Sequence, residues 1–240
     1  KAFEIQFSDE NNELQHPYQT SWGVSTRLIG MIIMAHGDDK GLKLPPAIAP
    51  VQVVIIPIIP KNAEPEKILD VANQIKESLV DIRVDIDDRN EVSPGFKFNE
   101  WELKGVPIRI EIGPKDIENN SVIVARRDKD DSKSQMAIDS ISAEIPNLLE
   151  VIQNDMFEVS QDFQSKNTHH VEDMDSLIAQ LNNADGFVSC YWVEDKDDEL
   201  KVKELTKATI RCYPLEIDDQ KPAVNKQDQN GRFVIFSKSY

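Results

Sequence analysis

The stretch Val51-Gln-Val-Val-Ile-Ile-Pro57 decides the fold of the middle of the chain. Consecutive apolar residues of this kind are typical of a strand that is buried on both faces of a sheet. Apolar residues at helical spacing over 64–79 predict a helix after it, and alternation over 82–86 predicts a second strand. Three further elements are expected: a short helix at 96–103 and strands at 106–112 and 122–125. Strands that alternate with helices indicate an α/β sheet.

The residues before this sheet predict a hairpin and a helix. Alternating apolar side chains at 3–7 predict a strand, and residues 18–22 are expected to return as its partner across a polar turn at 9–12. Apolar positions within 28–33 recur at helical spacing and predict a helix with a buried face. Residues 41–50 hold three prolines and indicate an exposed connector, at which we place a domain boundary.

The residues from 142 onward predict a third unit that mixes helices and strands. The expected elements are helices at 148–163, 174–181 and 199–205 and strands at 186–192, 209–213 and 233–236. The polar stretch 218–230 is expected to be a mobile loop. The chain is therefore expected to divide into domains at 1–48, 49–141 and 142–240, combining α/β and α+β architecture.

The 240 residues carry 27 Lys and Arg against 43 Asp and Glu, a formal net charge of −16. Such a chain repels phosphate on average, so nucleic-acid binding would need a local basic face. The longest nearly unbroken apolar run, Val53 to Ile59, is too short to cross a membrane. Two cysteines exclude a disulfide framework and a zinc site of four thiolates, and they fit a reducing cytoplasm. Because strand alternation begins at once, without an initiator Met or signal peptide, we expect the chain to begin inside a larger protein.

Two short motifs in the first unit carry groups that could do chemistry. Ser25-Thr26-Arg27 lies at a strand-to-helix junction, where free N–H groups attract anions and an arginine can clamp phosphate. The alternative, plain helix capping beside a surface arginine, is the one that the pattern alone favours. His36-Gly37-Asp38-Asp39 could suggest a metal site, but a helix end with glycine as its cap explains it better.

Cations of the second unit could form a basic face on one edge of the sheet. They are Arg89, Lys97, Arg109, Lys115, Arg126 and Arg127. Scattered, solvated charge is the commoner alternative, and the acidic run at 128–131 weakens the basic interpretation. Trp22, Trp101 and Trp192 could stack on bases, although core packing is the default for tryptophan. His169 and His170 are adjacent and therefore point apart on any regular element.

Three segments in order carry a resemblance to a known family. The first is Gln19-Thr-Ser-Trp-Gly-Val-Ser-Thr-Arg-Leu-Ile-Gly30, continuing through His36-Gly-Asp-Asp39 to Leu44-Pro-Pro-Ala-Ile-Ala-Pro50. The second is Asp87-Asp-Arg89, Pro94-Gly-Phe-Lys-Phe-Asn-Glu-Trp-Glu-Leu-Lys-Gly-Val-Pro107 and Gly113-Pro-Lys-Asp116. The third is Ala208-Thr-Ile-Arg-Cys-Tyr-Pro214 with Phe233-Val-Ile-Phe-Ser-Lys-Ser-Tyr240. They resemble, in turn, motif 3, the anticodon-binding domain and the C-terminal domain of prolyl-tRNA synthetases of the eukaryote- and archaeon-like type.

The resemblance implies activation of proline by ATP with Mg²⁺, then transfer of the prolyl group to tRNA(Pro). It implies the end of a class II catalytic domain, an anticodon-binding domain with a mixed sheet, and a small α+β C-terminal domain. By the same resemblance Arg27 would pack on the adenine and reach the ATP phosphates as the catalytic arginine. Ser25 and Thr26 would help to bind ATP, and Trp22 would wall the proline pocket. The candidates for tRNA contact are Arg89, Lys97, Glu100 and Lys115.

The sequence departs from the family pattern at the expected zinc site. The C-terminal domain of this family often carries four zinc-binding cysteines, but Val193 stands at the first position and Asp198 lies near the second. The stretch 218–230, where the second pair belongs, holds no cysteine. We therefore predict no structural zinc. Apolar packing is expected to hold the domain instead, through Phe187, Trp192, Ile210 and Phe236.

Motifs 1 and 2 of the family do not occur in the chain, which bears on activity and assembly. A homodimer is expected for a full-length parent, whereas the chain by itself is expected to be monomeric and unable to activate proline. Tyr240 either approaches the catalytic domain or simply ends a strand. The rival interpretations are a non-catalytic synthetase-like module that binds RNA or protein, and a structural interaction module. Retention of Ser25-Thr26-Arg27 favours the enzyme, located in the cytoplasm without a membrane partner.

Overall fold

The computed structural model describes residues 3–60, 64–130, 132–183 and 185–239, so Tyr240 lies outside the described residues. Contacts divide the chain into two compact units. The first, the N-terminal unit, comprises Lys1–Leu44, Ile48–Glu77 and Arg83–Met136. The second, the C-terminal unit, comprises Pro45–Ala47, Ser78–Ile82 and Ala137–Tyr240. The division at 1–48, 49–141 and 142–240 stays a prediction. Among the described residues, no helix combines the length and apolar character that a membrane span needs.

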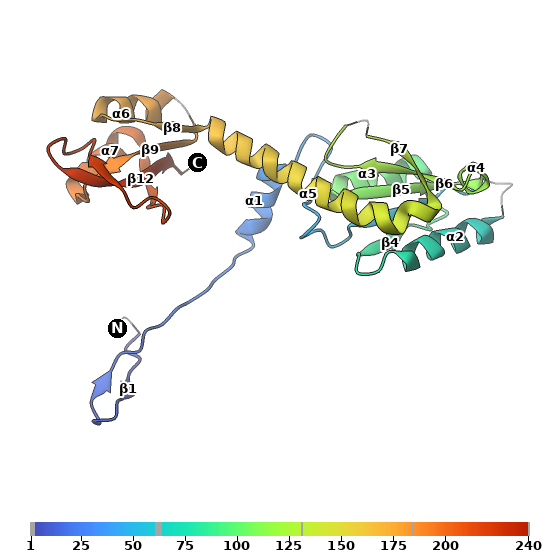
Figure 1. Ribbon diagram of the computed structural model, residues 1–240, viewed down its shortest axis with the longest axis horizontal. Helices are drawn as coiled ribbons and strands as arrows, with labels where there is room; N and C mark the ends of the chain where they lie inside the picture. Colours follow the sequence, from blue (N-terminus) through green and yellow to red (C-terminus); the bar gives the residue numbers. More distant parts are fainter. Residues whose placement is uncertain (1–2, 61–63, 131, 184, 240) are drawn as a thin grey trace. The chain divides into compact units, whose positions relative to one another are not determined.

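A mixed five-stranded sheet forms the centre of the N-terminal unit (Figure 1), and four of its strands lie where the sequence predicts strands. Its strand order is β4-β3-β5-β6-β7. The strands are β3 (Val53–Pro57), β4 (Val84–Ile86), β5 (Ile108–Ile112), β6 (Ser121–Arg126) and β7 (Ser134–Ala137). Strand β3 pairs in parallel with β4 and β5, and β6 runs antiparallel to β5. All five residues of β3 are buried, which explains why its sequence is apolar throughout.

Three helices belong to this sheet: α2 (Pro65–Ser78), α3 (Pro94–Lys104) and α4 (Pro114–Glu118). Helix α3 begins where Ser93 Oγ accepts a hydrogen bond from Phe96 N, and it ends at Gly105 with φ of 76°. A Cβ at Gly105 would lie 2.6 Å from Leu42 Cβ, so this position needs glycine for both its backbone angle and its space. The sequence did not predict the short elements α4 and β7.

The beginning of the chain forms a shorter hairpin than expected. Strand β1 (Phe7–Ser8) pairs with β2 (Leu14–Gln15), whereas residues 18–22 form no regular element, so their prediction as the returning strand is wrong. The reason lies in Asp9, whose Oδ1 accepts hydrogen bonds from the backbone N of Asn11 and of Glu13, both at 2.9 Å. This turn reverses the chain at once and starts the second strand at Leu14.

Helix α1 (Arg27–His36) lies where the apolar spacing predicts it, but its side chains are not buried in the described residues. Leu28, Ile29 and Ile33 are 44%, 62% and 48% exposed, which corrects the expectation of a buried face. The helix ends at Gly37, whose N–H donates to Ile33 O at 2.8 Å. Burial lowers the pKa of His36, so a charged imidazole is disfavoured at this helix end.

The connector after α1 is partly buried, and this differs from the exposed linker that the prolines suggest. Leu42 N donates to Leu103 O at 3.0 Å and Leu44 N donates to Gly105 O at 3.1 Å. Ala49 is fully buried. Hydrogen bonds to the end of α3 therefore hold the connector, and prolines only restrict its backbone.

The C-terminal unit is an α+β arrangement, as predicted. Its strand order is β10-β12-β9-β8, with β11 added on β12. The strands are β8 (Thr168–His170), β9 (Phe187–Trp192), β10 (Ala208–Cys212), β11 (Gln220–Pro222) and β12 (Asn230–Lys238). The helices are α5 (Ile141–Lys166), preceded by the 3₁₀ turn η1 (Ile138–Ser140), α6 (Met174–Asn183) and α7 (Lys196–Thr206). Strands β8 and β11 were not predicted, because their three residues carry too little apolar pattern.

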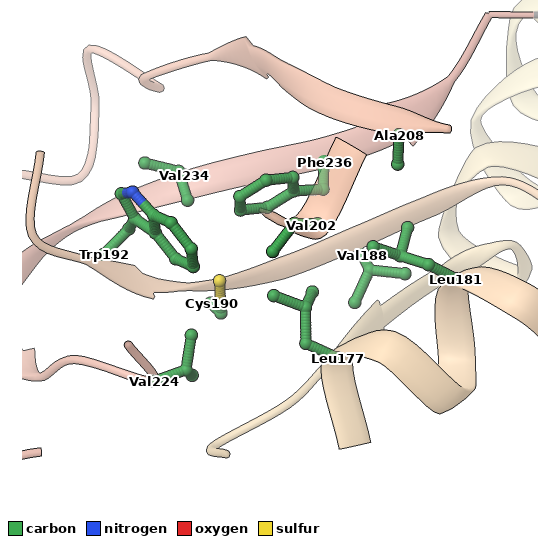
Figure 2. Packing of buried hydrophobic residues seen from close by; sticks show 10 residues of the cluster. All are labelled: Leu177, Leu181, Val188, Cys190, Trp192, Val202, Ala208, Val224, Val234 and Phe236. Carbon is green, nitrogen blue, oxygen red and sulfur yellow. The ribbon is translucent and has the colours of Figure 1, made fainter. Parts of the chain in front are cut away.

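An apolar core holds the C-terminal unit together (Figure 2). Trp192 and Phe236 lie at its centre, with ring centroids 5.1 Å apart and planes at 69°. Ile210 packs against this core, whereas Phe187 is only half-buried and does not belong to it. The expected mobile loop carries β11 and two buried residues, Ala223 and Val224, which corrects that expectation.

We expect Phe236→Ala to lower the free energy of unfolding of the C-terminal unit by about 3–5 kcal/mol, because it removes a fully buried ring and leaves a cavity. Urea unfolding followed by circular dichroism measures the change. Phe163→Ala is the matched control, since Phe163 is 70% exposed and its loss should alter stability by less than about 0.5 kcal/mol. Equal effects of the two variants would contradict this account of the core.

Candidate nucleic-acid interface

A pocket of about 340 Å³ opens in the N-terminal unit between the sheet and α3. Strands β3, β5 and β6, helix α3 and the loop after β6 contribute its walls. Its cations are Lys40, Arg109, Arg126, Arg127, Lys129 and Lys133, and its two acidic residues are Glu102 and Asp130. An acidic chain thus gathers positive charge at one place, which is the electrostatic signature of a nucleic-acid site.

Strand periodicity brings the first of these cations into the pocket. The pairing register sets Arg109 of β5 opposite Val54 of β3 and opposite Ala125 of β6. Paired residues on neighbouring strands share a face of the sheet, and all three line the pocket. Helix α3 covers the rest of this face with Phe98 and Trp101, which pack against Val54. The polar positions of β5 therefore meet the aromatic side of α3.

Arg109 lies over an aromatic ring. Its Cζ lies 4.5 Å from the centroid of the Phe98 ring, and Lys133 Nζ lies 5.3 Å from the same centroid. Glu111, only 6% exposed, binds both cations, with Oε1 3.0 Å from Arg109 Nη2 and 2.9 Å from Lys133 Nζ. One carboxylate cannot accept from all five guanidinium donors and three ammonium donors, so donor capacity remains for a ligand.

Asp38 ties the segment after α1 to this pocket. Arg127, whose side chain is 5% exposed, donates from Nη1 to Asp38 Oδ2 at 3.0 Å and from Nη2 to Asp38 Oδ1 at 2.6 Å. Its Nε donates to Glu102 O at 3.0 Å, and Lys43 Nζ lies 2.9 Å from Asp38 Oδ2. The Arg127 hydrogen bonds hold the pKa of Asp38 well below its usual range. The motif His36-Gly-Asp-Asp39 thus contacts the sheet through a bidentate pair in which Arg127 is buried and Asp38 reaches the surface.

Three of the four predicted tRNA contacts form a second network around Asp87, which is 4% exposed. Arg89 donates to Asp87 from Nε at 2.8 Å and from Nη2 at 2.6 Å, and the same Nη2 reaches Glu100 Oε2 at 2.7 Å. Trp101 Nε1 also donates to Asp87 Oδ2 at 2.8 Å. The Arg89 hydrogen bonds are the main reason that the pKa of Asp87 is lowered. Lys97 is 3% exposed and donates to Asp87 O at 2.8 Å, so its ammonium group is engaged within the domain, and its contact with RNA stays a prediction.

The fourth candidate and the motif 3 residues lie elsewhere. Lys115 is exposed on α4. Trp22 is 92% exposed, and Arg27 begins α1, where Ser25 Oγ accepts a hydrogen bond from Arg27 N at 3.4 Å. Thr26 is the N-cap residue of α1, without a side-chain capping bond. Within the described ranges, none of these five residues lines the basic pocket.

The pocket includes residues that the site prediction missed. Arg109, Arg126 and Arg127 belonged to the expected basic face but not to the chosen tRNA contacts. Lys40, Glu102 and Lys133 are not among the predicted contacts. Lys40 and Lys133 lie outside the predicted helices and strands, and Glu102 is one of several charged residues on α3 that periodicity does not distinguish. The signal that could have identified Arg109 is the alternation Ile-Arg-Ile-Glu-Ile over 108–112, where charged residues interrupt an otherwise buried strand.

Comparison with known proteins agrees with this geometry. Residues 52–148 match the family model described as an anticodon binding domain. Residues 174–240 match a second model, described as the C-terminal region of prolyl-tRNA synthetase. The mixed sheet with its covering helices therefore belongs to a domain of the anticodon-binding class.

Related sequences make the assignment more specific. The proline–tRNA ligase of Natranaerobius thermophilus is 43% identical over 243 residues, which cover all of this chain and 50% of that protein. The ligase of Alkaliphilus oremlandii is 49% identical over 216 residues, covering 90% of this chain and 44% of that protein. The chain matches the C-terminal part of prolyl-tRNA synthetases, so the predicted resemblance is confirmed. It spans about half the length of these relatives.

Solved structures support the same assignment. The prolyl-tRNA synthetase of Cryptosporidium parvum complexed with L-proline and AMP superposes with a TM-score of 0.86 at 38% identity. This match covers 99% of the present chain and 50% of that protein. A second structure of the Cryptosporidium enzyme, complexed with halofuginone and AMPPNP, gives a TM-score of 0.85. Both confirm the predicted fold class of a mixed α/β anticodon-binding domain and a small α+β C-terminal domain.

We expect Asp87→Asn to lower the free energy of unfolding of the N-terminal unit by about 3–5 kcal/mol at pH 7, because the buried Lys97 and the partly exposed Arg89 lose their anionic partner. The pKa of Asp87 is lower in the folded state than the ordinary value of about 4 for an aspartate. Ionised Asp87 therefore stabilises the fold at pH values above about 4, and this stabilisation is lost as the pH falls toward the pKa of the folded state. The free energy of unfolding of the wild type should therefore decrease below about pH 4. In the variant, the free energy of unfolding should depend less on pH over this range. Asp70→Asn, on the exposed side of α2, is the control in urea titrations between pH 7 and pH 3.

Proposed function

We propose that the basic pocket binds unpaired bases of the anticodon loop of tRNA(Pro), as part of a proline–tRNA ligase. The observation that carries this proposal is the placement of Arg109, one of six cations that line the pocket, over the ring of Phe98. Proteins read RNA sequence mainly in single-stranded loops, through stacking on aromatic or guanidinium planes and hydrogen bonds to base edges. The pocket offers both kinds of contact in one place.

The lining residues suggest separate roles for base and backbone recognition. Arg109 and Lys133 supply donors for base oxygens and nitrogens, and Glu102 supplies an acceptor for base amino groups. Lys40 and Lys129 add positive charge at the same pocket, which favours the phosphates of the loop. Arg89 and Lys115 remain candidates for contacts outside the pocket, and Glu100 acts by holding Arg89.

The wider activity is inferred from the match to prolyl-tRNA synthetases. We propose ATP-dependent activation of proline, with Mg²⁺ accompanying the nucleotide, and transfer of the prolyl group to tRNA(Pro). Arg27 would contact the adenine and the phosphates, with Ser25 and Thr26 beside the nucleotide and Trp22 at the proline pocket. Support comes from the exposed position of Arg27 at a helix start and from nucleotide and proline complexes of the Cryptosporidium relative.

Assembly and location are part of this proposal. A homodimer would form through the portion of the relatives that this chain does not span, and a reducing cytoplasm suits the two cysteines. Both are free thiols, Cys190 buried and Cys212 exposed. Burial raises the pKa of the Cys190 thiol to about 12, which keeps it protonated and unreactive at neutral pH.

We expect Arg109→Ala to weaken binding of a stem-loop with a proline anticodon by about 10–100-fold, because it removes a stacking plane and base-facing donors together. Fluorescence anisotropy at fixed salt measures the affinity, with a second stem-loop of changed anticodon to report specificity. Lys201→Ala also removes one positive charge, from the exposed face of α7, and should change affinity less than about twofold. Equal losses for both variants would mean that only net charge matters and would refute the pocket.

We expect Arg27→Ala, introduced into a complete ligase that contains this chain, to reduce proline-dependent pyrophosphate exchange by at least about 100-fold. The reason is loss of charge stabilisation at the ATP phosphates. Binding of the anticodon stem-loop should stay unchanged, which separates this test from the previous one. Unaltered exchange would favour the rival interpretation, a synthetase-like module that binds RNA without catalysis.

A further inference from the structure

Polar side chains join the start of α7 to the loop between β11 and β12 in the C-terminal unit. Asn225 Oδ1 accepts a hydrogen bond from Val193 N at 3.0 Å. Asn225 Nδ2 donates to Val193 O and to Asp198 Oδ2, both at 3.0 Å. One amide side chain thus satisfies the backbone of Val193 in both directions and contacts the first turn of α7.

Lys226 adds an ionic contact beside this amide. Its Nζ lies 3.1 Å from Asp198 Oδ2 and 3.2 Å from Asp195 Oδ2. Asp195 is also the N-cap residue of α7, where its Oδ1 accepts from the backbone N of Asp197 at 2.9 Å. The ammonium group therefore bridges two carboxylates that would otherwise repel each other at the helix start.

The position of this network in the sequence is informative. The family resemblance places zinc-binding cysteines at Val193, near Asp198 and in the 218–230 stretch, which are the segments that the network joins. The donors present do not suit zinc, because Val193 offers no side-chain ligand and Lys226 brings a positive charge to the same carboxylates. Among the described residues, no group of three or more His, Cys, Asp or Glu could hold a metal ion.

We propose that Asn225 and Lys226 form a metal-free clasp that performs the joining task of a zinc ion in this unit. The clasp holds the loop from which Val224 enters the apolar core beside Trp192 (Figure 2). Val224 N donates to Tyr191 O at 2.9 Å, so the loop is fixed directly before the two clasp residues. An ammonium group and an amide thus replace metal–ligand bonds with hydrogen bonds of ordinary length.

The charges around Lys226 support this assignment. Hydrogen bonds to Asp198 and Asp195 raise the pKa of Lys226, which favours its charged form. The side chains of Lys226, Asp195 and Asp198 are 35%, 33% and 24% exposed. Ion pairs at such exposure contribute modestly to stability. The hydrogen bonds from the Asn225 side chain to Val193 and the ion pairs of Lys226 with both aspartates must therefore act together.

Hydrogen exchange of the Val193 amide tests the clasp, because this N–H donates to the Asn225 side chain. In the full chain, Lys226→Met should accelerate exchange at Val193 by about tenfold, since loss of the ammonium group lets the loop open. Lys201→Met, an equal change on the exposed face of α7, should leave the rate unchanged. An unchanged rate in Lys226→Met would overturn the proposal.

Metal measurements on the wild-type chain give a second test, which is independent of how the variants fold. We expect no equivalent of zinc by atomic absorption after purification with added zinc. Exchange at Val193 should be the same before and after treatment with a chelator. One equivalent of bound zinc, or faster exchange after chelation, would show that a metal holds this segment and would refute the clasp.

Discussion

Alternation along β5 is the constraint on which the candidate RNA site depends. Ile108, Ile110 and Ile112 are fully buried, so the residues between them must point to the other face of the sheet. Glu111 is buried there and would be costly without a partner, and Arg109 and Lys133 neutralise it. The same pairing fixes Arg109 over Phe98. The requirement for stability and the surface for recognition thus come from the same side chains.

A net charge of −16 and a basic pocket are compatible because the carboxylates have local tasks. Asp38 docks one segment through Arg127, Asp87 organises the start of α3, and Asp195 caps α7. Other acidic residues remain spread over the surface, where they repel phosphate at long range. The proposed binding of RNA at the pocket would then depend on short-range contacts and would weaken steeply as salt concentration rises.

The sequence predicts those parts of the fold in which burial controls composition. Strand β3, buried at all five positions, and helix α2, with its regular apolar face, follow from periodicity alone. Strands β8 and β11 do not, because three polar residues held by neighbours carry no pattern of their own. The hairpin return was misplaced since aromatic residues at 18–22 imitate a strand, while the side chain of Asp9 closes the turn earlier. Local hydrogen bonding outweighs periodicity where little surface is buried.

Cations that could contact RNA are harder to choose from sequence than helices or strands, because the sequence presents all cations as equal. The structure separates them by the partners that surround each cation. Arg126 donates to Asp128 at 3.0 and 2.6 Å, and Arg127 donates to Asp38 in a bidentate pair that Lys43 also contacts, so the main partners of both guanidinium groups lie within the domain.

Glu111 is also shared by two cations, Arg109 and Lys133, and both of these lie beside the Phe98 ring. The proposed site is therefore marked by the combination of an aromatic ring with two cations that share one carboxylate. That three-body arrangement joins β5 to a loop more than twenty residues away, and no local pattern in the sequence reveals it.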